Sequence, residues 1–153
     1  MAEELKAIVF QLAEEVYGVD VNQVRTIERM VPLTRVPRTP AFVKGVMNLR
    51  SEVMPVIDLR ERFGLLAAAY SEDTRIIVVQ VDEIEVGLIV DAANDIIDLE
   101  QDHIESPPEV VGGVKAKYLR GVAKLDDGRL LSLLNLEEVL NKEEIVQLEQ
   151  IGG

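Results

Sequence analysis

The sequence predicts a mainly β fold in which two small closed or nearly closed barrels pack on each other and leave a groove between them. Three observations favour this fold: short runs rich in Val and Ile, tight acidic turns between the runs, and an internal repeat within the 153 residues. A barrel of about 65 residues buries a modest share of its surface and is marginally stable alone. We therefore expect the barrels to pack together.

The internal repeat relates the two halves of the chain. Residues Ile8–Ile27 align without gaps on Ile77–Ile96, and three identities coincide in that alignment: Gln11 with Gln80, Glu14 with Glu83, and Gly18 with Gly87. Residues Val53–Leu59 likewise match Leu130–Leu136 after one inserted residue in the preceding turn. The same segments thus recur in the same order, as in a duplicated architecture.

This repeat sets the expected domain organisation. We expect a single domain over residues 1–153, with a first barrel at 7–70, a second barrel at 71–135 and a C-terminal helix at 136–150.

Each half reads as two hairpins of short apolar strands. In the first hairpin of each half an acidic tight turn connects the two strands, and the turn of the last hairpin is Asp-Asp-Gly. In chain order, the expected strand pairs are Ala7–Leu12 with Val16–Val21, Val46–Leu49 with Val53–Ile57, Arg75–Val81 with Ile84–Val90, and Leu119–Leu125 with Leu130–Leu134.

Short helices are expected between and after the hairpins. Apolar residues at helical spacing (Val21, Val24 and Ile27) predict one, and the polar-capped turn over Asp91–Ile97 predicts another. Two capping pairs, Asp58 with Glu61 and Asn135 with Glu138, predict further helix starts.

The segment Met30–Pro40 (MVPLTRVPRTP) lies between the two hairpins of the first half. Each proline removes a backbone donor and fixes its own φ, so the segment cannot continue a helix or a central strand. We expect an extended connector at the surface.

Charge is distributed unevenly along the chain. Lys and Arg total 16 against 28 Asp and Glu, a net charge of -12. The stretch 25–50 nevertheless contains one acidic residue, Glu28, and six basic ones: Arg25, Arg29, Arg35, Arg38, Lys44 and Arg50. Overall acidity argues against nucleic acid and against anionic membrane surfaces. With 4% aromatic residues and no Trp, stacking surfaces for bases are poorly supplied. A protein partner is the better interpretation of the basic stretch.

Little in the sequence indicates an enzyme. There is no cysteine, and His103 is the single histidine, so a cage of several histidines around a metal is excluded. Asp58 and Asp91 each end an apolar strand, which leaves a carboxylate-dependent hydrolase as an alternative beside plain helix capping. The acidic run from Asp95 to Glu105 lacks the spacing of a calcium loop. We expect no cofactor and no metal.

Two segments, TPAFVKGVMNLRSEVMPVIDLRERFG and EEVYGVDVNQVRTIE, resemble the CheW family of chemotaxis coupling proteins, and the resemblance covers nearly the whole chain. It implies a fold of two SH3-like five-stranded β-barrels around a shared core. It also implies a non-enzymatic adaptor that joins the cytoplasmic tips of chemoreceptors to the regulatory domain of the histidine kinase CheA. Such a protein is cytoplasmic, held at the inner face of the membrane through receptor arrays, without inserting itself.

The resemblance also implies site residues. Gly45, Asn48 and Arg50 match the family's receptor-coupling element, and Ile96, with Ile76 beside it, matches a receptor-binding groove position. Val21 and Val24 resemble the kinase-contacting patch, with core packing as the alternative. Arg50 is the most informative of these, because the repeat has Asp126 in its place, so the hairpin itself does not need a base there. The alternative is a surface arginine with no task.

One position departs from the family pattern. The family usually has Gly directly after Asn-Leu-Arg, and this chain has Ser51. Glycine there permits φ above zero at little cost, so Ser51 leaves the geometry of the turn, and the direction of Arg50, open.

A generic β-barrel interaction module, including an RNA-binding one, is the alternative function.

Overall fold

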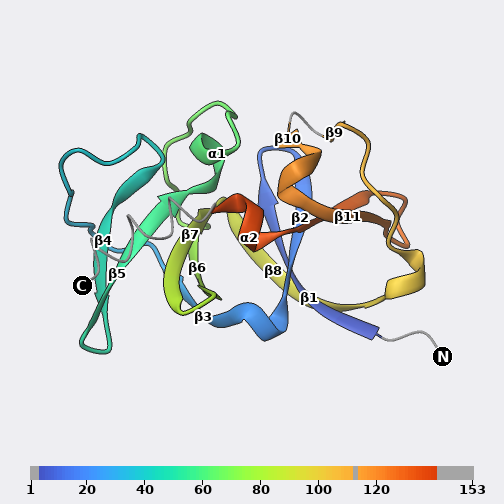
Figure 1. Cartoon of the computed structure of the whole chain (residues 1–153), viewed down its shortest axis with the longest axis horizontal. Helices are drawn as coiled ribbons and strands as arrows, with labels where there is room; N and C mark the ends of the chain where they lie inside the picture. Colours follow the sequence, from blue (N-terminus) through green and yellow to red (C-terminus); the bar gives the residue numbers. More distant parts are fainter. Residues whose placement is uncertain (1–3, 112–113, 141–153) are drawn as a thin grey trace.

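Two five-stranded sheets lie side by side in the computed structural model, which describes residues 4–111 and 114–140 (Figure 1). The strands are β1 (Glu4–Leu12), β2 (Glu15–Asp20), β3 (Val24–Arg29), β4 (Val43–Leu49), β5 (Glu52–Asp58), β6 (Arg75–Val81), β7 (Ile84–Val90), β8 (Ala92–Glu100), β9 (Val110–Val111), β10 (Val114–Lys115), β11 (Leu119–Lys124) and β12 (Leu130–Leu134). The α-helices are α1 (Leu59–Arg62) and α2 (Leu136–Val139), and 3-10 turns span Val21–Gln23, Gln101–His103 and Ala116–Tyr118.

The two sheets have equivalent strand orders. One sheet runs β11-β12-β2-β1-β8 and the other runs β4-β5-β7-β6-β3, so each strand of the first half takes the place of its repeat partner in the second. The inner contacts β12·β2 and β5·β7 are parallel, whereas the other neighbours are antiparallel. The mainly β class with two similar units is therefore confirmed.

The expected subdomain boundaries, 7–70 and 71–135, do not coincide with the sheets. The hairpin β1–β2 of the first half pairs with β8 and β12 of the second half, and β6–β7 of the second half pairs with β3 and β5 of the first. The halves therefore exchange their first hairpins, which makes each sheet a product of both. This exchange is a reason to treat the chain as a single folding unit.

Neither sheet closes fully into a barrel. The edges β3 and β4 of one sheet, and β8 and β11 of the other, are linked by isolated bridges instead of a full ladder: Thr34 with Val46, and Glu105 with Val122. The Thr34 bridge is made by two backbone hydrogen bonds of 3.0 and 2.8 Å. Each unit is thus a nearly closed barrel with a seam.

The two segments expected as short helices are mostly strands. Val21–Gln23 is a 3-10 turn, but Val24–Arg29 pairs with β6 as β3, and the expected helix over Asp91–Ile97 lies largely in β8, which pairs with β1. Along β3, exposed residues alternate with half-buried ones, which is the period of a strand. Pairing to a distant strand overrides the local helical spacing.

One of the two expected helix caps is present. The Asp58 carboxylate accepts from the backbone N–H groups of Arg60 and Glu61 at 2.9 and 3.4 Å, whereas the Asn135 side chain makes no capping hydrogen bond. The Asp58 N–H donates to the Phe42 carbonyl, so Glu61 does not complete a reciprocal capping box. The expected C-terminal helix at 136–150 begins as α2, and its part beyond residue 140 lies outside the described residues.

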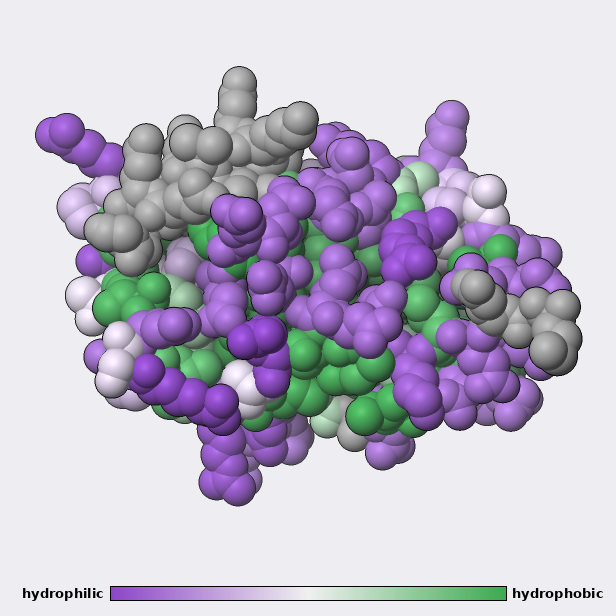
Figure 2. All heavy atoms as spheres, turned by 60° about the horizontal axis from the view of Figure 1, so that its bottom comes forward, coloured by the Kyte–Doolittle hydropathy of each residue, from purple (hydrophilic) through white to green (hydrophobic). Residues whose placement is uncertain are grey.

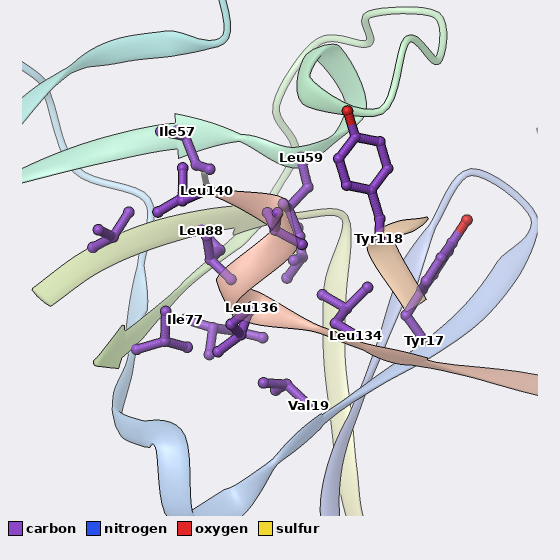
Figure 3. Close-up of a cluster of buried hydrophobic side chains, with 14 of the residues drawn as sticks. Tyr17, Val19, Ile57, Leu59, Ile77, Leu88, Tyr118, Leu134, Leu136 and Leu140 are labelled. Carbon is purple, nitrogen blue, oxygen red and sulfur yellow. The ribbon is translucent and has the colours of Figure 1, made fainter. Parts of the chain in front are cut away.

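Three apolar clusters fill the molecule. The largest lies between the sheets and takes residues from both of them and from α2, including Tyr17, Leu88 and Leu136 (Figure 3). The other two each pack on the opposite face of one sheet, one around Val9 and Leu131 and the other around Met54 and Val78. This arrangement confirms two units around a shared core.

Five of the six aromatic residues gather where the sheets meet. Phe10, Tyr17, Phe63 and Tyr118 form a row with ring centroids 5.8, 6.2 and 5.1 Å apart, and Phe42 packs against the same core. The guanidinium of Arg62 lies over the rings of Phe42 and Tyr118, 4.7 and 5.3 Å from their centroids. Large rings are thus used to join the units and not to line an external site. No helix among the described residues has the length and apolarity needed to cross a bilayer.

Candidate functional site

The tip of the β4–β5 hairpin consists of two residues, Arg50 and Ser51. The last strand pair is Leu49 with Glu52, and the two tip residues have φ of 53° and 70°. Positive φ at both central residues is the signature of a type I′ turn, whose twist matches that of the flanking strands. Ser51 therefore adopts the conformation for which glycine is the usual residue, and the turn keeps its geometry at the cost of some backbone strain.

Arg50 is presented to solvent beside a hollow at the seam of its sheet. The side chain is exposed, and it has no ion pair or hydrogen bond among the residues that the structure describes. The hollow measures about 330 Å³ and is lined by Val24, Arg25, Thr26, Leu49, Arg50, Glu52, Met54, Val78 and Glu85. Arg25 is bound to Glu85 at 3.2 Å across this hollow, so Arg50 is the arginine there with unused donors.

Asn48 and Val53 form a neighbouring exposed pair. They face each other across β4 and β5, and Val53 is 48% exposed. An amide and an apolar side chain are thus exposed on this hairpin, on the face opposite to Leu49 and Met54, which line the hollow. Sequence reasoning selected Asn48 and missed Val53.

Gly45 has a structural task. Its φ is 144°, and a Cβ atom at this position would overlap the carbonyl of Thr34, which bridges to the adjacent Val46. A Cβ atom added to Gly121 would likewise lie 2.6 Å from the carbonyl oxygen of Glu105. Because the repeat has glycine in both places, this residue is needed wherever the crossing chain meets the hairpin.

Ile96 and Ile76, expected to share a groove, lie in different environments. Ile96 on β8 is 59% exposed, whereas Ile76 on β6 is 0% exposed and packs in the cluster around Met54. Ile76 therefore offers no side-chain surface to a partner, contrary to the expectation. Ile96 also lies on the other sheet from Asn48.

Val21 and Val24 are half-buried and pack against the shared core. Core packing, the alternative interpretation, accounts for part of each side chain. Val24 also lines the hollow beside Arg50, so the structure brings one expected kinase-contacting residue and one expected receptor-contacting residue to the same depression.

The repeat reveals exposed apolar residues that local reasoning missed. Ile27 is the repeat partner of Ile96, and Val53 is the partner of Leu130; all four are exposed, at 39, 59, 48 and 49%. Figure 2 shows apolar atoms reaching one face in patches separated by hydrophilic ones. Two equivalent pairs of apolar side chains, one pair per unit, suit a molecule with two docking faces.

The second sheet has a matching hollow with a different charge. It measures about 530 Å³, and its lining includes Asp95, Asp98, Glu100, Asp126 and Asp127 against Lys124 and Arg129. Arg129 is held by Asp127 at 2.7 Å. The two seams are thus alike in position and unlike in charge.

The strand-end carboxylates are committed to structure. Asp58 is buried, caps α1 with one oxygen and accepts the Tyr70 hydroxyl at 3.0 Å with the other. Burial, together with the nearby Asp58 carboxylate, raises the pKa of the Tyr70 phenol, so the hydroxyl remains a donor. Asp91 is held by Arg60 and by the Ala13 N–H at 2.8 Å. Neither has the free oxygen that a hydrolase base would use.

The other candidate sites have ordinary surface roles. The His103 ring is 75% exposed and lies 3.4 Å from the Glu100 carboxylate. No cluster of three or more His, Asp or Glu side chains suited to a metal ion occurs within residues 4–111 and 114–140.

Two equivalent five-stranded units around a shared core, each with a hollow at its seam, define a mainly β module built from two similar halves. Residues 6–144 match the family model described as CheW-like domain. The chain is 41% identical over 138 residues to "Chemotaxis protein CheW" of Bacillus subtilis, covering 90% of this chain and 88% of that protein. It is 35% identical over 145 residues to the protein of the same name from Klebsiella aerogenes, covering 95% and 87%.

A solved structure gives the same result. The scaffolding protein TtCheW of Thermoanaerobacter tengcongensis superposes with a TM-score of 0.84 at 37% identity, over 94% of this chain and 92% of that one. The chain belongs to the CheW family.

Proposed function

We propose that this chain is a non-enzymatic adaptor of chemotaxis signalling, which couples chemoreceptors to their histidine kinase. Family membership over residues 6–144 supports this role, since the relatives are named chemotaxis proteins and a solved relative is named a scaffolding protein. The partners at the finer level are the cytoplasmic tip of the receptor and the regulatory domain of CheA. Through them the chain is held in receptor arrays at the inner face of the membrane.

The observation that carries the receptor contact is the arginine at the β4–β5 tip, which has no ion pair or hydrogen bond to any described residue. Arg50 offers a planar fork of donors that suits carboxylate or carbonyl acceptors on a partner helix. The turn that carries it accepts positive φ at both residues, and the repeat partner of Arg50 is Asp126, so recognition explains the guanidinium better than folding does. Asn48 and Val53 form an exposed pair on the same hairpin, on the face opposite to the hollow.

The kinase contact is assigned to the half-buried pair Val21 and Val24, with the exposed Ile27 further along β3. Apolar side chains at a sheet edge suit a β-structured partner. The kinase regulatory domain is expected to be such a partner, because it resembles this family. Ile96, on the other sheet, provides a second apolar contact for the receptor. Coupling then follows from geometry, because one rigid body holds both partners in register.

The receptor contact is tested by retention of the chain on an immobilised receptor cytoplasmic fragment. We expect Arg50→Glu to lower retention at least about tenfold, the loss typical of a charge reversal at a central contact. Lys115→Glu is the matched control, because Lys115 is an exposed base on β10 and the charge change is the same. Equal retention of Arg50→Glu and wild type, at equal folded content, would refute the assignment.

A further inference from the structure

A second basic surface lies on the connector between β3 and β4, away from the Arg50 hollow. It is a hollow of about 560 Å³ lined by Arg35, Val36, Pro37, Arg38, Thr39, Pro40, Ala41, Val43 and Lys44, and we call it the connector hollow. It shares no lining residue with the hollow beside Arg50. Its volume is in the range of pockets that hold a small ligand or a few side chains of a partner.

The connector is fixed at both ends and within. The Thr34 bridge to Val46 anchors its start, and the Phe42 carbonyl accepts the Asp58 N–H at 2.8 Å near its end. Between them, the Thr39 hydroxyl donates to the Val36 carbonyl at 2.9 Å. Proline at positions 32, 37 and 40 restricts the backbone further. The backbone that carries the basic side chains is thus held in one path, which lowers the backbone part of the entropy cost of binding.

Two of its three bases have no partner among the residues that the structure describes. Arg35 and Arg38 are exposed, and neither makes an ion pair or side-chain hydrogen bond to any residue the structure describes. Lys44 is paired with Glu61. No Asp or Glu occurs in sequence between Glu28 and Glu52, so the positive charge is concentrated in a chain of net charge -12.

The repeat shows that the fold does not require these bases. The equivalent crossing segment of the second half makes its bridge through Glu105, in the place of Thr34, and carries Asp102 and Glu109 nearby. That segment, residues 101–118, also holds Lys115 and Lys117, so it has three acids and two bases where the connector has bases and no acid. Charge here is free to serve recognition.

We propose that the connector hollow binds an acidic segment of a partner polypeptide, at a docking site separate from the receptor and kinase contacts proposed above. Arg35 and Arg38 are donors without acceptor capacity, so carboxylates are their natural partners. Val36, Pro37, Pro40 and Ala41 add apolar wall, which a segment with alternating acidic and apolar side chains contacts and a free inorganic anion does not.

The test uses the full chain and a fluorescent peptide of alternating Glu and Leu. We expect binding that weakens as salt rises and is at least about tenfold weaker for Arg35→Glu/Arg38→Glu, since both unpaired charges are reversed. Amide chemical-shift changes on titration should centre on residues 35–44. Lys115→Glu should bind like wild type, and thermal melts should show that all variants are folded.

Four outcomes would overturn the proposal. The first is equal affinity of wild type and the double variant for the Glu/Leu peptide, and the second is an equal loss of affinity in Lys115→Glu. The third is binding of a Lys/Leu peptide as tight as that of the Glu/Leu peptide. The fourth is saturable binding of inorganic phosphate by a chain that does not bind the Glu/Leu peptide. The last outcome would define a small-anion site. Arg50→Glu should keep full peptide affinity even if it loses the receptor, so failure of this site and failure of the proposed function are distinguishable.

Discussion

Arg60 and Asp91 form a two-pronged ion pair that ties the two repeat halves together. The Arg60 Nε atom donates to Oδ1 at 2.8 Å and the Nη2 atom to Oδ2 at 2.5 Å, while the Ala13 N–H reaches the same carboxylate at 2.8 Å. Arg60 is in α1, Asp91 joins β7 to β8, and Ala13 is in the β1–β2 turn. One carboxylate thus holds elements of both sheets where they meet.

Asp91→Asn should lower the free energy of unfolding by about 1–3 kcal/mol, because it removes charge-assisted hydrogen bonds that are only partly exposed. Urea denaturation measures this. Asp98→Asn, which breaks the exposed pair with Lys6, is the control and should change stability by less than about 0.5 kcal/mol. A double-mutant cycle with Arg60→Gln that finds no coupling energy would show that the ion pair does not stabilise the fold.

Ser51→Gly should stabilise the chain by up to about 1 kcal/mol. Serine is held at φ of 70°, a region that glycine enters without a steric cost, although glycine loses more entropy on folding. Ser106→Gly is the matched control, since Ser106 has no positive φ, and it should give no gain. If both variants shift the denaturation midpoint equally, strain at the tip is not the cause.

Gly45→Ala and Gly121→Ala should both destabilise the fold by more than about 2 kcal/mol, because the new Cβ atoms meet backbone carbonyl groups that cannot move freely. Gly64→Ala separates this effect from backbone strain alone, since its φ is 76° and no atom lies near its Cβ position. Thermal melts rank the three. A stable Gly45→Ala variant that fails only in receptor binding would instead make Gly45 a direct contact residue.

Tyr17→Phe should leave stability unchanged or slightly raised at neutral pH, because the buried hydroxyl has no hydrogen-bond partner among the described residues. Burial raises the pKa of Tyr17 from 10.0 to about 12. Between these two pKa values the unfolded chain releases the Tyr17 proton while the folded chain keeps it. The free energy of unfolding is therefore unaffected by this group below pH 10 and falls as pH rises from 10 to about 12. The variant should lose less stability over this window in urea titrations at stepped pH.

Tyr70→Phe provides the contrast to Tyr17→Phe. Its hydroxyl donates to the buried Asp58, so the variant should lose about 1–3 kcal/mol at neutral pH. Similar behaviour of the two variants at neutral pH would contradict the different roles assigned to the two hydroxyls.

The hairpins could be predicted because they depend on local pattern. Arg75–Val81 and Ile84–Val90 are the bounds of β6 and β7 as well as of the runs in the sequence. The exchange of hairpins between halves could not be predicted, since the pairing of β5 with β7 joins residues far apart in the chain. The same non-local pairing turned the helical spacing of Val24 and Ile27 into a strand.

The exposure of one candidate site residue could be predicted, because that residue stands out from its repeat partner, whereas its role in binding stays a prediction. Arg50 differs from Asp126, and it lies exposed at a hairpin tip as expected. Ile76 was misplaced because β6 is buried on both faces: Ile76 packs in one cluster and Ile77 in another, so no alternation distinguishes them. Ile27 and Leu130 were missed, although comparing exposed positions across the repeat finds them.

The most direct test is co-sedimentation of the kinase regulatory domain with receptor fragments assembled on vesicles. Wild-type chain should bring the kinase domain into the pellet in proportion to the amount of chain added, and Arg50→Glu should leave it in the supernatant while still binding it in solution. Sedimentation of the kinase domain to the same extent with Arg50→Glu, or with no chain present, would contradict the coupling role.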